Sequence, residues 1–252
     1  MEKGEREKIE EVRQAHHEGT AQEKYHKSFG GTYIKDMVYG ANDGIVTTFA
    51  VVAGVAGAKL DAPVVLILGF ANLIADGLSM AIGNYLGTKS EQQYVAQERT
   101  MEEWEVAHVP EEEREEIRQM YRAKGFQGED LERAVAVITS DNKRWVDEMM
   151  RNELGVVADD EDPSRPFKNG LATFIAFVIA GFLPLVPYVF GASAKGLLPS
   201  SMMAGAALFA VGGARSFITK KSWWWAGIEM LLVGGIAAGA AYAVGALVER
   251  FI

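Results

Sequence analysis

The chain has 252 residues, 49% of them hydrophobic, and a formal net charge of −9. Residues 88–166 hold 21 acidic and 11 basic residues, whereas the rest of the chain is nearly neutral and very apolar. This pattern excludes a disordered chain and argues against an ordinary soluble globule. The acidic balance disfavours nucleic acid as a partner, and the absence of Cys excludes disulfides and thiolate metal sites.

The first 35 residues are polar and lack the apolar core of a signal peptide. We expect a cytoplasmic segment that forms an amphipathic helix. Its role stays open at the level of the sequence.

Five apolar stretches follow, each near the ~20 residues that a helix needs to cross a bilayer. Many glycines in them predict close helix packing, and Pro184 and Pro187 predict a bend or break in the third. Core helices of a soluble protein are the alternative, but so many long apolar runs would need a much larger polar shell. The sequence predicts an all-α integral membrane protein with five transmembrane helices, at 38–58, 63–86, 169–190, 197–219 and 223–248.

Lys and Arg are concentrated in the N-terminal segment and between the fourth and fifth stretches. Because such residues favour the cytoplasmic side, we expect the N-terminus inside and the C-terminus outside. The plasma membrane of a prokaryote fits best. The predicted organisation is a cytoplasmic segment (1–35), transmembrane helices 1 and 2 (36–86), an acidic cytoplasmic domain (87–166) and transmembrane helices 3 to 5 (167–252).

Pro110 and the segment 125–128 divide the acidic domain into three predicted helices, at 87–107, 111–124 and 129–154. The first is expected to continue the second transmembrane helix without a break. Each helix carries two carboxylate or thioether side chains three or four residues apart, which places them on one face. Converging helices of this kind can bind Fe²⁺ or Mn²⁺, and a solvated acidic face is the alternative. The pairs are Glu102 and Glu105, Glu113 and Glu116, and Met149 and Glu153.

Ionisable residues inside membrane spans are energetically expensive and commonly mark a pathway. Asp36 lies at the mouth of the first span, and Asp43 lies within it. Asp76 lies in the middle of the second span, one turn before Met80. These residues predict a cation path lined by carboxylates and a thioether. The alternative is a structural Asp bonded to the neighbouring backbone or to the amides of Asn42 and Asn72.

Three motifs resemble those of the vacuolar iron transporter family, which includes plant and yeast vacuolar iron and manganese transporters and prokaryotic relatives. The resemblance spans residues 33–248. It implies a prokaryotic-type homodimer with five spans that exports Fe²⁺, and often Mn²⁺, from the cytosol in exchange for protons. It implies no permanent cofactor and no enzymatic activity. The motifs are Tyr39-Gly-Ala-Asn-Asp-Gly-Ile45, Gly77-Leu-Ser-Met-Ala-Ile-Gly83 and Pro184-Leu-Val-Pro-Tyr188.

The resemblance also implies site residues, because the family's cytoplasmic domain binds metal through Glu and Met. Two departures bear on ion preference and proton coupling: Asn84 replaces a Glu of many members, and a carboxylate expected near Asn72 is absent. Asp76, one turn from Asn72, can compensate. The matching metal positions are Glu102, Glu105, Glu113, Glu116, Met149 and Glu153, and the matching path positions are Asp43 and Met80, with Asp36 at the cytoplasmic end.

The same residues are compatible with two other classes of protein. A membrane-anchored di-iron carboxylate enzyme needs Glu-x-x-His pairs on two helices, and the acidic clusters contain one, Glu105 and His108. A metal sensor or scaffold with a membrane anchor has no reason to carry intramembrane Asp residues. The residues therefore favour a transporter.

Overall fold

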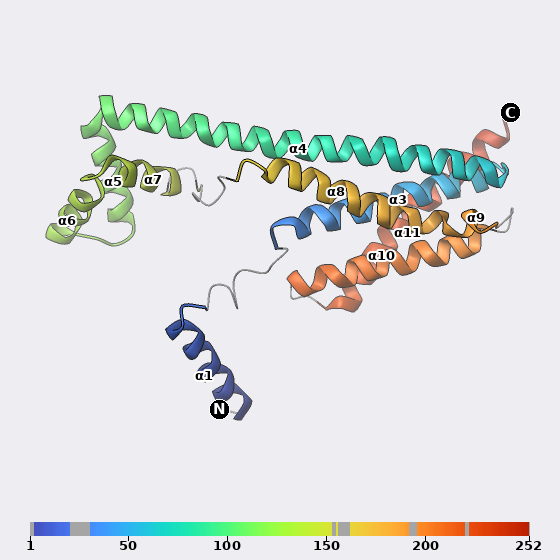
Figure 1. Cartoon of the computed structure of the whole chain (residues 1–252), viewed down its shortest axis with the longest axis horizontal. Helices are drawn as coiled ribbons and strands as arrows, with labels where there is room; N and C mark the ends of the chain where they lie inside the picture. Colours follow the sequence, from blue (N-terminus) through green and yellow to red (C-terminus); the bar gives the residue numbers. More distant parts are fainter. Residues whose placement is uncertain are drawn as a thin grey trace. The chain divides into compact units, whose positions relative to one another are not determined.

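Long apolar helices dominate the computed structural model of the chain (Figure 1), which describes residues 3–20, 31–152, 155, 162–191, 196–219 and 222–251. Every regular element in these ranges is helical, so the predicted all-α fold is confirmed. The elements are α1 (Lys3–His17), α3 (Gly31–Gly57), α4 (Ala62–His108), α5 (Pro110–Ala123), α6 (Gly128–Ile138), α7 (Asn142–Asn152), α8 (Arg165–Phe182), the 3₁₀ turn η2 (Leu183–Leu185), α9 (Val186–Val189), α10 (Leu197–Thr219) and α11 (Trp223–Glu249).

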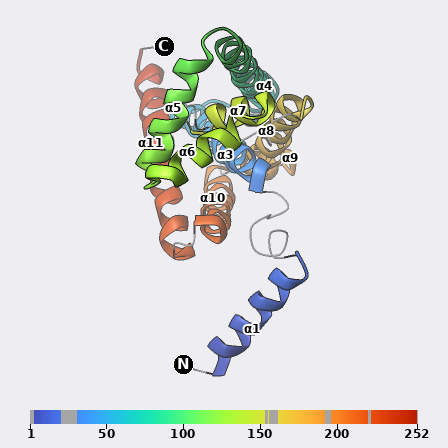
Figure 2. The same cartoon turned by 90° about the vertical axis from the view of Figure 1, so that its left-hand side faces the viewer.

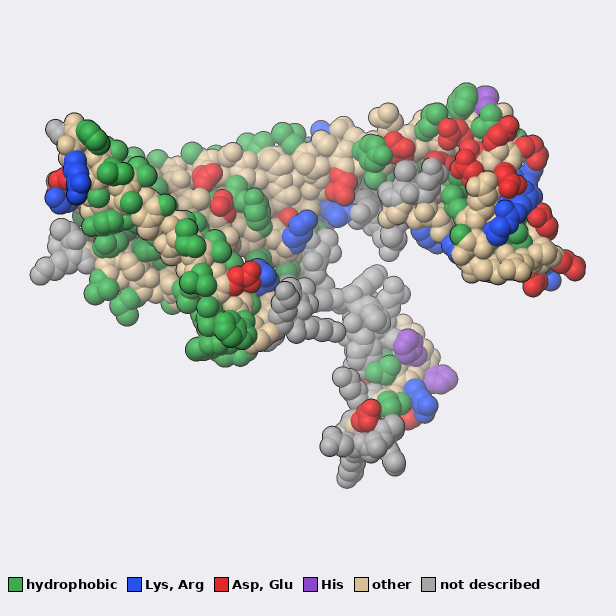
Figure 3. Space-filling view, turned by 180° about the vertical axis from the view of Figure 1, so that it is seen from behind, with side chains coloured by type: hydrophobic (Ala, Val, Ile, Leu, Met, Phe, Trp, Pro, Cys, Tyr) green, Lys and Arg blue, Asp and Glu red, His purple; other side chains and the backbone are tan. Residues whose placement is uncertain are grey.

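Five helical segments among the described residues are long and apolar enough to cross a membrane. Helix α4 is unbroken from the second span to His108, as the sequence predicts. Figure 3 shows hydrophobic side chains covering the apolar helices with few charges among them. The chain is therefore a multi-pass membrane protein, with candidate spans at Tyr33–Gly57, Ala62–His108, Arg165–Val189, Leu197–Ser216 and Trp223–Glu249.

The chain divides into two compact units. We call Met1–Asn84 together with Lys168–Ile252 the membrane unit, and Tyr85–Phe167 the insert unit. Each contains its own buried hydrophobic clusters. The two units are described separately below.

Within the membrane unit, glycines bring the backbone of α3 against that of α8. A Cβ atom at Gly40 would lie 2.5 Å from the carbonyl oxygen of Thr173, and one at Gly44 would collide with the carbonyl of Phe177. Helices in lipid associate through such close packing of small residues, because no hydrophobic drive exists between them. The contact fixes α3 directly on α8.

Helix α4 meets α8 in a different way. A Cβ atom at Gly77 would lie 3.2 Å from the ring of Phe177 and 3.3 Å from the ring of Phe174. Side chains, not backbones, therefore separate α4 from α8 at this point.

The third span breaks where its prolines predict. Helix α8 ends at Phe182, and η2 and α9 continue the chain. A proline removes a backbone donor and leaves carbonyl groups without helical partners. The hydroxyl of Ser200 in α10 donates to the carbonyl oxygen of Pro184 over 2.6 Å, which satisfies one of them inside the bundle.

The insert unit is built from the C-terminal part of α4 and from α5, α6 and α7, which lie together in Figures 1 and 2. Pro110 begins α5, where its missing N–H is not needed. Apolar residues spaced three or four apart along α6 face inward. They form one core with α4, α5 and α7, whose buried members are Val106, Ile117, Leu131, Val135, Ile138, Trp145, Val146, Met149 and Met150.

The predicted single helix at 129–154 is wrong. Helix α6 ends at Ile138 and α7 begins at Asn142. The side chain of Asp141 accepts a hydrogen bond of 2.8 Å from the backbone N–H of Arg144, which caps α7 and competes with a continuous helix. Glu153 lies outside the described residues, and α8 begins at Arg165.

Candidate functional site

Polar contacts connect α3 to α4 at two levels of the membrane unit. The amide nitrogen of Asn84 donates to a carboxylate oxygen of Asp36 over 3.0 Å. Farther along both helices, the amide nitrogen of Asn72 donates to the hydroxyl of Thr47 over 3.1 Å. Because α3 and α4 run antiparallel, the earlier residue of α3 meets the later residue of α4 and the later meets the earlier. The two contacts define one polar face between the helices.

Asp43 and Asp76 occupy the same face between these two contacts. Their side chains are partly buried, and they lie close enough for their charges to interact. Met80, one turn beyond Asp76, packs against the hydrophobic cluster that contains Phe177. The structure thus brings the four predicted path residues, including Asp36, onto one face of two helices.

One form of the structural alternative for Asp43 was a bond from the Asn72 amide, but that amide donates to Thr47. Among the described residues, no hydrogen bond joins Asp43 or Asp76 to a side chain or to the backbone. A carboxylate in this setting is available to a cation or a proton.

Two residues of α8 join this face and were not found from the sequence. The hydroxyl of Thr173 accepts a hydrogen bond of 2.7 Å from the Asn84 amide, and the backbone carbonyl of Asn169 lies 3.4 Å from the same nitrogen. Asn169 and Thr173 lie 85 and 89 residues from Asn84 in the chain, respectively, so only the packing of α8 reveals them.

Three of the predicted metal ligands converge in the insert unit. Glu102 and Glu105 of α4 and Glu113 of α5 each place one carboxylate oxygen within 4.8 Å of the others. Glu102 and Glu113 are buried, at 6% and 5% exposed, and Glu105 is partly buried. A set of buried carboxylates at this separation suits a divalent cation, because oxygen ligands favour hard metals.

The other three predicted ligands do not join this set. Glu116 is exposed on α5. Met149 is fully buried in the hydrophobic core beside Val106 and Ile117, where the thioether serves packing. Glu153 lies outside the described residues. We call Glu102, Glu105 and Glu113 the glutamate cluster.

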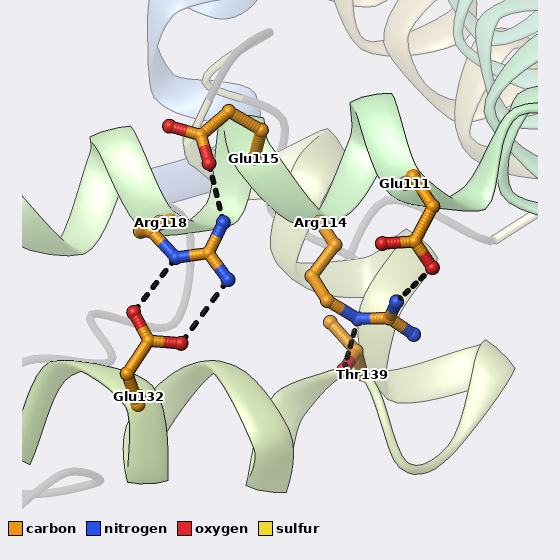
Figure 4. A network of polar contacts seen from close by, with 6 residues as sticks. All are labelled: Glu111, Arg114, Glu115, Arg118, Glu132 and Thr139. Atoms are coloured by element: carbon orange, nitrogen blue, oxygen red, sulfur yellow. Dashed lines mark hydrogen bonds and ion pairs between the residues drawn. The ribbon is translucent and has the colours of Figure 1, made fainter. Parts of the chain in front are cut away.

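Many other acidic side chains of the insert unit are engaged with arginines (Figure 4). Arg118 of α5 forms an ion pair with Glu115 and a two-pronged pair with Glu132 of α6, at 2.8 and 3.1 Å. Arg114 pairs with Glu111 at 2.7 Å. The bond from Arg118 holds the pKa of Glu132 below its usual value. Only the pair with Glu132 joins two helices, α5 and α6, whereas Glu111 and Glu115 pair with arginines of their own helix.

A second polar group joins α5 to α7. The hydroxyl of Tyr121 donates to Glu148 over 2.7 Å. Burial, together with this bond, raises the pKa of Tyr121 to about 12. Burial alone would raise the pKa of Glu148, but hydrogen bonds from Tyr121 and Asn152 outweigh it, so that pKa is lowered.

The family model with the description VIT family matches residues 34–246. The vacuolar iron transporter of Toxoplasma gondii is 36% identical over 236 residues, 90% of this chain and 78% of that protein. Vacuolar iron transporter 1 of Arabidopsis thaliana is 32% identical over 221 residues, 87% of this chain and 88% of that protein. Vacuolar iron transporter 1 of Tulipa gesneriana is 30% identical over 234 residues, 92% and 94% of the two chains.

The chain therefore belongs to the VIT family. This confirms the resemblance found in the sequence. The family relatives are named as transporters, so the prediction that the chain is not an enzyme is confirmed as well.

Proposed function

We propose that this protein transports Fe²⁺, with Mn²⁺ as a second substrate, out of the cytosol in exchange for protons. The observation that carries the proposal is that Asp43 and Asp76 lie near one another on the α3–α4 face, between the Asn84–Asp36 and Asn72–Thr47 contacts and inside candidate spans. Two carboxylates in a low-dielectric region are costly unless they bind something. The names of the relatives supply iron as the first substrate.

The path we infer uses both units in turn. The glutamate cluster collects divalent ions and raises their concentration on the cytoplasmic side. Ions then pass Asp36, shed water, and reach the part of the face that holds Met80, Asp43 and Asp76. A carboxylate that holds a metal must release its proton, so these two residues are the exchange point for ions and protons. The thioether of Met80 adds a preference for softer ions.

The proposal places the N-terminus and the insert unit in the cytoplasm and the C-terminus outside, in the plasma membrane of a prokaryote. It includes a homodimer, which the family resemblance implies. Light scattering of the purified protein tests this point, since a dimer has twice the 27.5 kDa of the chain.

Uptake of Fe²⁺ and Mn²⁺ into proteoliposomes, with and without an imposed pH gradient, tests the function. Protein-free liposomes are the control. Flux that follows the gradient supports proton exchange. Flux that does not depend on the pH gradient would support metal transport but reject proton exchange. Metal binding without flux under any gradient overturns the proposal in favour of a membrane-anchored sensor.

A further inference from the structure

The amide nitrogen of Asn84 lies among three oxygen atoms from two other helices. The Asp36 carboxylate of α3 is 3.0 Å away, the Thr173 hydroxyl of α8 is 2.7 Å away and the Asn169 carbonyl of α8 is 3.4 Å away. The Thr173 hydroxyl also donates to the Asn169 carbonyl over 3.0 Å. One polar hydrogen-bond donor therefore occupies the centre of a group of acceptors.

The orientation of this amide is fixed by its surroundings. If the amide were flipped, its oxygen would face the Asp36 carboxylate and the Asn169 carbonyl, which can only accept hydrogen bonds. The site is also held in place, because Thr173 is fully buried and Asn169 is 6% exposed. The close approach of Gly40 to Thr173 fixes α3 against α8 at the same level.

We propose that the group formed by Asp36, Asn84, Asn169 and Thr173 is a cation-binding site, and that the Asn84 amide nitrogen occupies the position that the ion would take. The inference rests on the proposed function and adds a step to it. Turning the amide about its last side-chain bond presents its oxygen to the centre. The ligands are then the Asp36 carboxylate, the Thr173 hydroxyl, the Asn169 carbonyl and the Asn84 amide oxygen.

The donor set defines the class of ion. Four oxygens without sulfur or imidazole select hard divalent cations and do not separate Mn²⁺ from Fe²⁺. A bound ion would draw the oxygens inward, to about 2.0–2.6 Å. The single carboxylate keeps binding weak, and a site that ions must leave requires this. Selection between metals is left to the face that contains Met80.

Binding of Mn²⁺ to the purified full-length protein, followed by the loss of the free-ion signal in electron paramagnetic resonance, tests the site. The background carries Glu102→Ala, Glu113→Ala, Asp43→Asn and Asp76→Asn, which leaves one carboxylate of the glutamate cluster, Glu105, and none of the Asp43–Asp76 pair. In this background we expect Thr173→Val, which keeps the shape and removes the hydroxyl ligand, to weaken Mn²⁺ binding by about tenfold.

The matched control is Ser201→Ala, because the Ser201 hydroxyl bonds only the carbonyl of Leu197 in its own helix, at 2.7 Å. It should leave binding unchanged. Asn84→Asp supplies a second carboxylate and should tighten binding by at least about tenfold. Helical circular dichroism and gel filtration establish that each variant is folded. Equal affinities for Thr173→Val and Ser201→Ala overturn the inference, as does an Asn84→Asp variant that binds no more tightly.

Transport in the otherwise unaltered protein gives a second readout. Thr173→Val should raise the KM for Mn²⁺ and keep the maximal rate, whereas Asn84→Asp should lower both, because a tighter site releases its ion slowly. If the unaltered protein carries no flux, the proposed function fails and the binding titration alone decides this inference. If flux is present and Thr173→Val matches Ser201→Ala in both assays, this inference fails and the proposed function stands.

Discussion

The carboxylates of the membrane unit and those of the insert unit have opposite surroundings. Asp43 and Asp76 are partly buried within helices that are mostly apolar, and their carboxylates lie near one another. The glutamate cluster belongs to a unit whose surface carries many charges of both signs, and several acids outside the cluster are paired with arginines (Figures 3 and 4).

The difference teaches which observation identifies a site in each setting. Inside a membrane the presence of a carboxylate is itself informative, because each one is costly. In the insert unit acidic residues are abundant, and their number says little. Burial and convergence separate the glutamate cluster from acids such as Glu115 and Glu132, which are paired with Arg118 instead.

The largest expected effect separates the two regions directly. Asp43→Asn keeps the shape of the side chain and removes its charge, so transport should fall by about two orders of magnitude, equivalent to roughly 3 kcal/mol of lost ion stabilisation. Metal binding by the glutamate cluster should be unchanged, as measured by calorimetric titration. Transport at the normal rate would remove Asp43 from the path.

The converse change acts on the insert unit. Glu102→Gln with Glu113→Gln should weaken metal binding there by about tenfold or more, while flux at saturating metal persists. Without metal the same change should raise the free energy of unfolding by about 1–3 kcal/mol, because it relieves repulsion among close carboxylates. Glu112→Gln, an exposed neighbour on α5, is the control. A metal-free protein destabilised by the double change would contradict this view of the cluster.

A third change affects the packing that supports the membrane site. Gly40→Ala forces a methyl group against the Thr173 carbonyl and should destabilise the protein by about 1–3 kcal/mol. Gly239→Ala in α11 meets no atom within 4 Å and should have little effect. Thermal unfolding in detergent compares the two. Equal melting temperatures would show that α3 and α8 can separate easily.

The smallest effect concerns the ion pairs of the insert unit. Because the folded-state pKa of Glu132 is lowered by Arg118, its contribution to stability is present at neutral pH. It is lost as the pH falls through the lowered pKa. Glu132→Gln should therefore reduce the melting temperature slightly at pH 7, and the difference from the unaltered protein should vanish in strong acid. A difference in melting temperature that grows in acid would contradict a stabilising contribution from the ionised Glu132.

Much of the fold follows from the sequence because membrane spans are long and uniform. The apolar stretches, the two prolines of the third span and the unbroken α4 are local features, and each is found where it is predicted. The break between α6 and α7 was missed because it depends on one cap, in which Asp141 accepts from the N–H of Arg144. Helical periodicity alone continues through such a point.

The site shows the same division between local and distant information. Spacing on one helix indicates that Glu102 and Glu105 share a face, and the structure places Glu113 beside them. The same rule was insufficient for Glu116, which shares the spacing but points to solvent. Thr173 carries no motif, and only its packing against Asn84 marks it.

The unequal packing of the membrane helices has a consequence for how a path between them opens. Backbone contact at Gly40 and Gly44 makes α3 and α8 a fixed frame, whereas rings at Gly77, which can change rotamer, separate α4 from it. A tilt of α4 therefore meets side chains at this point, whereas a movement of α3 meets the backbone of α8. Since α3 and α4 are joined by separate hydrogen bonds at Asn84 and at Asn72, such a tilt can break one and keep the other. The two amides of α4 are thus independent attachments to α3, one on each side of the Asp43 and Asp76 carboxylates along the helices.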